Sequence, residues 1–305
     1  MAIAKVPELP EVETTLRGIE PHIINKTISS VIIRQPSLRW PVPKSLIKRK
    51  LEKKKIENIK RRGKYLLLES SNEYLIVHLG MSGSLRISKK ENLKKHDHID
   101  ICFEDGTVLR YCDPRRFGCF LWSKDIDTHF LLKNLGPEPL GNSFSGDYLF
   151  YKSRKRKVAI KNFIMNSKVV VGVGNIYASE ALFAAGIRPS SIAGKVPRKK
   201  YDLLAKEIVQ ILRKSIEEGG TTLRDFIGGD NTPGYFKQSL RFMDVKKKHV
   251  INVTQSLKVK ELDREPVPIA PNAIYFLNFS CKAFITIGST NESIFHPWRL
   301  FLSPR

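Results

Sequence analysis

The chain has 305 residues, of which 41% are hydrophobic, so it can bury one large core or, as we expect, two. Its 53 lysines and arginines against 30 acidic residues give a formal charge of +23, with a pI of about 9.9. This excess predicts a polyanionic partner. Nucleic acid is favoured over a membrane surface, because no single helix gathers the charge beside an aromatic-rich apolar face. No run is apolar enough to cross a bilayer and no basic-then-apolar leader opens the chain, so we expect a cytoplasmic protein.

The cysteines predict neither a disulfide framework nor a metal site. There are four of them, without a Cys-x-x-Cys pair: Cys102, Cys112, Cys119 and Cys281. Three lie in a region rich in predicted strands, where buried free thiols are the expected state.

The first predicted element is a helix that opens within Pro7 to Thr14, Pro-Glu-Leu-Pro-Glu-Val-Glu-Thr. Pro10 suits a first helical turn, and Glu11 and Glu13 favour the positive end of the helix dipole. Three apolar residues then fall on one face at helical spacing: Val12, Leu16 and Ile19. Taken alone, the pattern indicates an ordinary amphipathic helix.

The next region is mostly strands. Six short runs of β-branched or aromatic residues, separated by turn signals, each predict one: Thr27–Arg34, Lys64–Glu69, Tyr74–His78, His98–Phe103, Val108–Tyr111 and Phe117–Trp122. Several strands in succession suggest a sandwich or a barrel. Asp125 to Leu140 contains Leu-Gly-Pro-Glu-Pro-Leu, which interrupts periodic structure and reads as a linker.

Beyond the linker lies the densest basic run, which leads into apolar helical spacing: Lys152, Arg154, Lys155, Arg156, Lys157 and Lys161. A solvated face is the alternative to a nucleic-acid contact for such a run.

A glycine-rich segment, Val169 to Asn175, opens a predicted helix from Ile176 to Ala185. We expect Asn175 to be the N-cap, and bare amides with close glycines make such a helix start an anion site. A tight turn is the alternative for this pattern. A second amphipathic helix, Tyr201 to Glu218, ends at Gly219-Gly220, and Thr221 to Gly234 reads as a mobile loop.

Together these segments resemble the formamidopyrimidine-DNA glycosylase family. PELPEVET followed by LRGIEPHI is similar to the family's opening, and matching motifs continue to about Arg241. The resemblance implies an α+β fold, with an N-terminal helix plus a two-layer β-sandwich and then a mostly helical helix–two-turn–helix domain. It implies an extension (1–6), a catalytic sandwich domain (7–124), a linker (125–145), a DNA-binding domain (146–241) and an aberrant, irregular tail (242–305).

The resemblance implies a base-excision repair glycosylase. Such an enzyme removes oxidised purines, 8-oxoguanine and formamidopyrimidines, and cleaves the abasic strand by β,δ-elimination through a Schiff base. We expect a monomer that acts on double-stranded DNA with oxidised bases at the bacterial nucleoid, without a membrane partner. Two alternatives stay open: a related endonuclease VIII type for oxidised pyrimidines, and a non-catalytic relic that binds lesion DNA.

Four positions match the family's catalytic residues. Pro7 would attack the sugar as a secondary amine, and Glu8 would protonate the opening sugar oxygen. Glu11 would order the opened sugar. Lys64 would contact the lesion site or a phosphate and supply a proton, although an isolated lysine is usually solvated.

Other positions match residues that contact DNA. The resemblance implies that Met81, Arg115 and Phe117 fill the gap left by the extruded nucleotide, although methionine would ordinarily be core filling. Three positions would contact the DNA backbone, with Arg115 as a further DNA contact: His96, Lys157 and Asn175. A surface histidine is the alternative for His96.

Both ends of the chain depart from the family. A proline inside a chain is a tertiary amide without a free lone pair, so either residues 1–6 are absent from the working protein or Pro7 is inert. Valine's GTG codon can also initiate translation, and we hypothesise that synthesis starts at position 6.

The family's zinc finger should follow Arg241, but its two Cys-x-x-Cys pairs are absent here, so we expect no cofactor. Codons exist for which a shifted frame from Phe242 places cysteines in four slots with the spacing of a zinc site: Val250, Val253, Ala270 and Ala273. We hypothesise a frameshift just before residue 242 and expect poor order after it.

Overall fold

The first helix, α1 (Leu9–Ile23), begins as the sequence predicts. The structure, a computed structural model, describes residues 7–219. Glu8 is the N-cap, and its backbone N–H donates to the Glu11 carboxylate at 3.0 Å in a capping box, with Pro10 in the first turn. The predicted apolar face is confirmed, since its three residues are buried in the core of the sandwich: Val12, Leu16 and Ile19.

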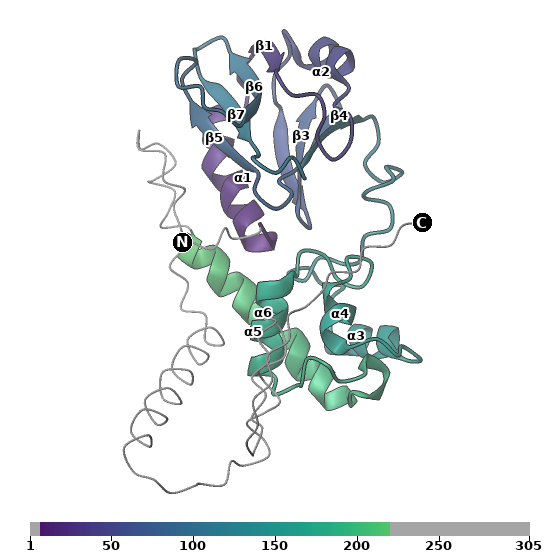
Figure 1. The fold of residues 1–305 in the computed structure, drawn as a ribbon. Coiled ribbons are helices and arrows are strands. Elements are labelled where there is room, and N and C mark those ends of the chain that lie inside the picture. Colours follow the sequence, from purple (N-terminus) through teal and green to yellow (C-terminus); the bar gives the residue numbers. More distant parts are fainter. Residues whose placement is uncertain (1–6, 220–305) are drawn as a thin grey trace, which may run out of the picture. The chain divides into compact units, whose positions relative to one another are not determined.

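Two four-stranded antiparallel sheets follow α1 and pack against each other (Figure 1). The first has the order β1 (Ile28–Ile33), β6 (Asp97–Phe103), β7 (Val108–Cys112) and β5 (Ser84–Ser88). The second has the order β2 (Asn58–Arg62), β3 (Tyr65–Ser70), β4 (Glu73–His78) and β8 (Cys119–Ser123). The two-layer sandwich is therefore confirmed.

All six predicted strands are present, but within the sandwich domain the prediction missed two strands and one helix. β2 has one apolar residue among polar and charged ones, and β5 has only two apolar residues, so neither contains the run of β-branched or aromatic residues on which the prediction relied. Helix α2 (Lys44–Leu51) buries only Ile47 and Leu51. The prediction also started the last strand two residues early, because Phe117 lies in the loop before β8 and is 43% exposed.

The rest of the described chain is helical. It comprises α3 (Gly146–Ser153), α4 (Ile160–Met165), α5 (Asn175–Ala184), the short 3₁₀-helix η1 (Ala193–Lys195) and α6 (Arg198–Gly219). The helix predicted from Tyr201 begins three residues earlier. These helices share a second core, which also takes in Leu9 of α1. The opening residue of α1 thus packs into the helical core, while the later turns pack on the sandwich.

One member of the predicted basic run is structural. The Arg154 guanidinium stacks on the Phe150 ring at 3.9 Å and donates to the carbonyl oxygen of Val196 at 3.1 Å. Its charge is therefore used within the helical lobe, whereas Lys155, Arg156 and Lys157 are exposed.

The segment between β8 and α3 carries no helix or strand. It is nevertheless fixed, since Leu132 packs against Leu67 and Ile76 on the outer face of the second sheet. Glu138 accepts hydrogen bonds from the Gly63 N–H at 2.6 Å and from Arg61 at 2.7 Å.

Three predictions lie outside the described residues: the extension 1–6, the loop 221–234 and the tail 242–305. Within residues 7–219, no helix is long and apolar enough to cross a membrane. The cysteines of the sandwich are free thiols, with Cys102 and Cys119 buried and Cys112 half-buried.

Candidate active site

The Glu8 carboxylate caps the first turn of α5 from the start of α1. Its Oε2 accepts from the Gly174 N–H at 2.7 Å and from the Tyr177 N–H at 3.4 Å, and its Oε1 accepts from the Ile176 N–H at 2.9 Å. Only 1% of Glu8 is exposed. A carboxylate at this position meets both the unpaired amides and the positive end of the helix dipole.

The glycines before α5 make this contact sterically possible. Gly172 has φ +83°, and a Cβ there would lie 2.5 Å from the Leu9 side chain. A Cβ on Gly174 would lie 2.3 Å from the Glu8 carboxyl carbon. The Leu9 N–H also donates to the Gly172 carbonyl at 3.1 Å. The Gly-x-Gly pattern therefore lets the start of α1 lie directly against the start of α5.

One detail of the predicted helix start is wrong, since Gly174, and not Asn175, is the N-cap of α5. The amides of the predicted anion site are bonded to the protein's own Glu8 carboxylate. The Asn175 side chain is exposed one residue further on.

Glu11 joins the same hydrogen-bond network. Besides its capping bond to the Glu8 N–H, its carboxylate accepts from the Tyr177 hydroxyl at 2.8 Å, and that hydroxyl lies 2.6 Å from Ser215 Oγ of α6. Gly174, Tyr177 and Ser215 were not recognised from the sequence as members of the site. Only the Gly-x-Gly-Asn pattern marked this region, because partners more than 160 residues apart leave no local signal.

The electrostatic environment shifts Glu8 and Lys64 toward each other in pKa. Burial raises the pKa of Glu8 above its ordinary value, although Lys64 and the α5 amides act in the opposite direction. Burial lowers the pKa of Lys64, against the charges of Glu8 and Glu11. A carboxyl with a raised pKa and an amine with a lowered pKa are suited to proton transfer near neutral pH.

The turn that carries Lys64 is held from two sides. Arg61 donates to Glu13 of α1 at 2.8 Å and to Glu138 at 2.7 Å, and Gly63, with φ +58°, donates its N–H to Glu138. Neither Arg61 nor Glu138 was recognised as a positioning group from the sequence. Pro7, directly before Glu8, is half-buried. The structure thus brings together Glu8, Glu11 and Lys64 of the four predicted catalytic residues, with Pro7 adjacent in the chain.

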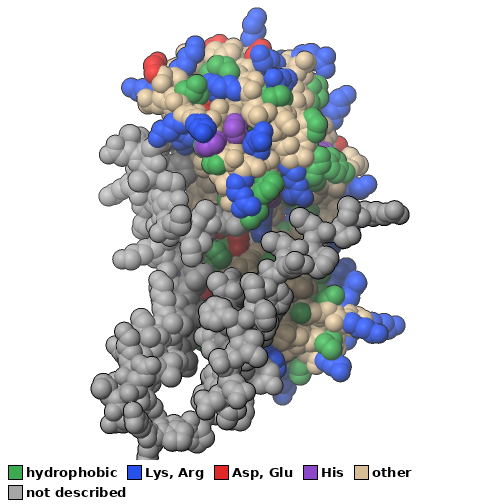
Figure 2. Space-filling model, in the orientation of Figure 1, with side chains coloured by type: hydrophobic (Ala, Val, Ile, Leu, Met, Phe, Trp, Pro, Cys, Tyr) green, Lys and Arg blue, Asp and Glu red, His purple; other side chains and the backbone are tan. Residues whose placement is uncertain are grey.

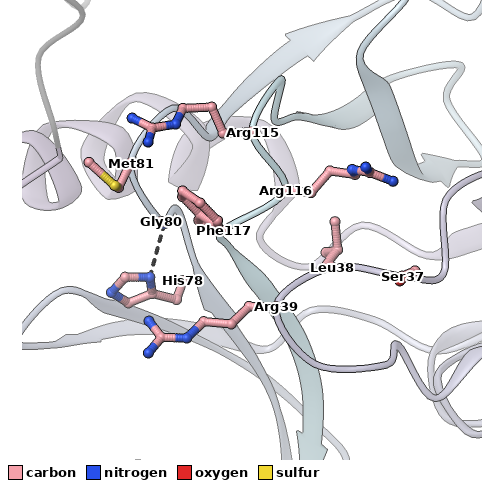
Figure 3. Close-up of a pocket in the computed structure, with 9 residues that line it drawn as sticks. All are labelled: Ser37, Leu38, Arg39, His78, Gly80, Met81, Arg115, Arg116 and Phe117. Carbon is pink, nitrogen blue, oxygen red and sulfur yellow. Dashed lines mark hydrogen bonds between the residues drawn. The ribbon is translucent and has the colours of Figure 1, made fainter. Parts of the chain in front are cut away.

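A second group of predicted residues lies on two neighbouring loops of the sandwich. Met81 is in the β4–β5 turn, and Arg115 and Phe117 are in the β7–β8 loop (Figure 3). All three are exposed, and the Arg115 guanidinium lies 4.9 Å from the Phe117 ring centre. They border a hollow of about 710 Å³ that is also lined by Leu38, Arg39, His78 and Arg116 among others. We call these three exposed side chains, a thioether, a cation and a ring, the wedge.

His78 connects the two groups and was not singled out in the sequence. Its ring lies 4.8 Å from that of Tyr65, and its Nδ1 accepts the Gly80 N–H at 2.9 Å. Burial lowers the pKa of His78 to about 4, and the charges of Lys64 and Arg39 act in the same direction. His78 is therefore neutral at pH 7, with its proton on Nε2.

The three predicted backbone contacts are accessible but separate. His96 is half-buried at the end of a loop that the buried Arg110 holds through the carbonyl oxygens of Asn92 and Lys90, at 2.6 and 3.2 Å. Lys157 is exposed between α3 and α4, and Asn175 is exposed at the start of α5. Figure 2 shows Lys and Arg side chains distributed over the presented face of the described residues, with few acidic ones among them. Such a surface suits a phosphate backbone.

Residues 7–219 contain no group of His, Cys, Asp and Glu side chains that could hold a metal ion. After the three cysteines of the sandwich, the sequence supplies only Cys281. One cysteine does not provide the two Cys-x-x-Cys pairs of a four-cysteine zinc site.

Comparisons with known proteins match both halves of the described chain. The family models for the formamidopyrimidine-DNA glycosylase N-terminal domain and H2TH domain match residues 6–120 and 135–227. A formamidopyrimidine-DNA glycosylase of Stutzerimonas stutzeri is 57% identical over 236 residues, which cover 77% of this chain and 87% of the relative.

Solved structures agree. A Lactococcus lactis formamidopyrimidine-DNA glycosylase bound to DNA with an abasic site is similar with a TM-score of 0.65 and 35% identity, covering 72% of this chain and 85% of that one. The enzyme from the same organism with FAPY-dG-containing DNA has a TM-score of 0.66 and 34% identity, with coverages of 72% and 84%.

We expect Gly174→Ala to destabilise the protein by about 1–3 kcal/mol, because the added methyl group would overlap the Glu8 carboxylate. Urea unfolding measures the change. Gly141→Ala is the matched control: a Cβ there meets nothing closer than 3.5 Å, and we expect a change within about 0.5 kcal/mol. Equal stabilities of the two variants would contradict the direct contact between Glu8 and Gly174.

The lowered pKa of His78 predicts a pH-dependent stability. Between pH 6.5 and about 4, His78 is protonated in the unfolded chain but neutral in the folded protein. The free energy of unfolding therefore falls as the pH falls through this window. His78→Asn keeps an acceptor for the Gly80 N–H but does not titrate. Urea unfolding at several pH values should therefore show a smaller loss for His78→Asn than for the wild type, and parallel curves would contradict the shift.

Proposed function

The chain belongs to the formamidopyrimidine-DNA glycosylase family, and from this premise we propose how its residues remove oxidised purines from DNA. The protein is a DNA glycosylase for oxidised purines, and cleavage of the abasic strand is standard for its family. Its partner is DNA that contains lesions or abasic sites. The observation that carries the mechanism is the position of Glu8. This residue directly follows Pro7, and its buried carboxyl is held by the first turn of α5.

We propose that Pro7 is the nucleophile and is N-terminal in the working protein. An α-amino group titrates near pH 7.7–8.0, so it would be partly neutral at pH 7. Its nitrogen would bond to C1′ as the bond from C1′ to the damaged base breaks, and the base would leave with the bonding electrons and take up the proton that the Pro7 nitrogen releases. The N-terminal family match starts at residue 6, the position of the proposed initiator, which supports this start.

Glu8 is the proposed general acid. Its raised pKa lets it give a proton to the sugar ring oxygen as the bond between that oxygen and C1′ opens, which leaves an iminium ion on Pro7. A general base then takes a C2′ proton, the C–H bonding electrons pass to the iminium to form an enamine, and the enamine expels the 3′ phosphate; a second elimination expels the 5′ phosphate. Glu11 orders the opened sugar, and Lys64, with its lowered pKa, exchanges protons with the reacting groups.

The second part of the proposal concerns recognition. Met81, Arg115 and Phe117 occupy the space of an extruded nucleotide: the thioether and ring replace lost stacking, and the guanidinium pairs with the orphaned base. Exposed cations and amides hold the backbone, with three proposed contacts: His96, Lys157 and Asn175. Residues 7–124 would thus form the catalytic domain and residues 146–241 the DNA-binding domain, with residues 125–145 as the linker between them. Because the substrate is DNA and the named relatives are bacterial, we propose that the protein acts at the nucleoid in the cytoplasm.

Borohydride trapping tests the nucleophile. A protein that begins at Pro7 should form a covalent complex with a duplex containing 8-oxoguanine, because reduction fixes the iminium. The 305-residue chain, in which Pro7 is a tertiary amide, should form none. Trapping of both proteins at the same rate would contradict the proposal, and trapping of neither would favour the non-catalytic alternative.

Glu8→Gln in the protein that begins at Pro7 tests the acid. Opening of the sugar ring, measured as borohydride-trapped complex and strand cleavage, should fall by about 10²–10⁴-fold, because the amide cannot donate the proton, while the protein stays folded by circular dichroism. Trapping and cleavage within about threefold of the wild type would contradict the role of Glu8.

The family typically carries a structural zinc, and we propose that a frameshift before residue 242 removed its ligands from this chain. Metal analysis should find no stoichiometric zinc in the chain as encoded. A gene with the frame restored should yield about one zinc per chain, since two Cys-x-x-Cys pairs form one tetrahedral site. Stoichiometric zinc in the encoded chain, or codons that cannot give the shifted cysteines, would overturn the frameshift.

A further inference from the structure

The two wedge loops are joined by a buried carboxylate that the proposed chemistry does not use. Asp113 follows β7 and is fully buried. Its Oδ1 accepts the Ser82 hydroxyl at 2.7 Å, and its Oδ2 accepts the Tyr111 hydroxyl and the Gly118 N–H, both at 2.9 Å. One carboxylate thus holds the residue after Met81 and the residue after Phe117.

Ser82 closes the connection to Arg115. While its hydroxyl donates to Asp113, its oxygen accepts the Arg115 N–H at 3.1 Å. This single side chain of the β4–β5 turn therefore fixes the backbone of the residue whose guanidinium belongs to the wedge. Without the hydroxyl, Arg115 would lose its bond to the neighbouring loop.

The backbones of the two loops also touch directly. A Cβ on Gly80, where φ is +69°, would lie 2.5 Å from Gly118 N, and a Cβ on Gly118 would overlap the Tyr111 hydroxyl. The main chain of Asp113 is bonded as well: its N–H donates to the His96 carbonyl, and its carbonyl oxygen accepts the Arg116 N–H and lies 2.8 Å from His98 Nε2. The loops are packed too closely to move independently.

We propose that Ser82, held by Asp113, is a positioning residue that makes Met81, Arg115 and Phe117 enter the duplex as one rigid unit. This inference rests on the proposed role of the three side chains in filling the gap. A wedge that is already ordered loses little conformational entropy on insertion, so its rigidity favours the extruded state of a lesion. Binding to undamaged DNA, which depends on exposed cations, does not require the wedge.

Ser82→Ala in the full chain tests the coupling directly. Amide hydrogen exchange at Arg115 should accelerate about tenfold, because its acceptor is lost. Ser82→Thr retains the hydroxyl and should restore slow exchange. Ser29→Ala is the matched control, since it removes one hydrogen bond, to the Cys102 carbonyl at 3.1 Å on β6, without touching either loop.

Binding to two duplexes of the same sequence tests the consequence. Ser82→Ala should weaken binding to a duplex with 8-oxoguanine about tenfold, and leave binding to the undamaged duplex within about twofold. Ser82→Thr and Ser29→Ala should retain the wild-type ratio. Unchanged Arg115 exchange in Ser82→Ala, or equal weakening on both duplexes, would overturn the inference.

The hydrogen-exchange and binding measurements together also distinguish a failure of this inference from a failure of the proposed function. If the wild-type chain bound both duplexes equally, the proposed lesion recognition would fail. The exchange rates would then decide alone whether Ser82 couples the loops, with slow Arg115 exchange in Ser82→Ala counting against it.

Discussion

The rest of the site depends on the hydrogen bonds that the Glu8 carboxylate accepts from three backbone N–H groups at the start of α5. They connect the first turn of α1 to the helical lobe, where Leu9 is also buried. A helix start leaves its first amides without partners inside the helix, and here the partner comes from a residue 166 positions earlier in the chain. The position of Pro7 follows from this bond, because Pro7 precedes Glu8 directly.

Two physical effects oppose each other at Glu8. Amide hydrogen bonds and the helix dipole stabilise the carboxylate, and Lys64 acts in the same sense. Burial favours the neutral acid, and it is the larger effect, so the pKa rises. The same bonds that orient the group therefore leave it able to hold a proton. Lys64, which burial shifts downward, supplies the complementary amine.

A similar arrangement recurs at the wedge. Asp113 is also a buried carboxylate, which accepts the Gly118 amide of its own loop and the Ser82 hydroxyl of the neighbouring turn, and it orders exposed side chains that have few contacts of their own. Met81 and Phe117 are more than one-third exposed, so packing alone does not fix them. In both places the functional residue is held by its neighbours on the chain, and those neighbours are held by a carboxylate.

Sequence patterns predicted the features that depend on local periodicity. The apolar face of α1 was found from its helical spacing, and six of the eight strands in residues 7–219 were found as runs of β-branched or aromatic residues. The polar strands β2 and β5 contain no such run. The resemblance placed the candidate catalytic residues in the chain, and the local pattern misassigned the cap of α5, because it could not show that Glu8 already occupied the amides. Arg154 was counted as surface charge because stacking on Phe150 leaves no trace in composition.

Titration of the Glu8 side-chain carboxyl by carbon-13 NMR, in the full chain with selectively labelled glutamate, tests the central claim most directly. Assignment by comparison with Glu8→Gln identifies the resonance. The account predicts a midpoint above the ordinary value of 4.5, because burial outweighs the α5 amides and Lys64. A midpoint at or below 4.5 would contradict it, since Glu8 would then be a fixed anionic cap of α5 without a proton to give.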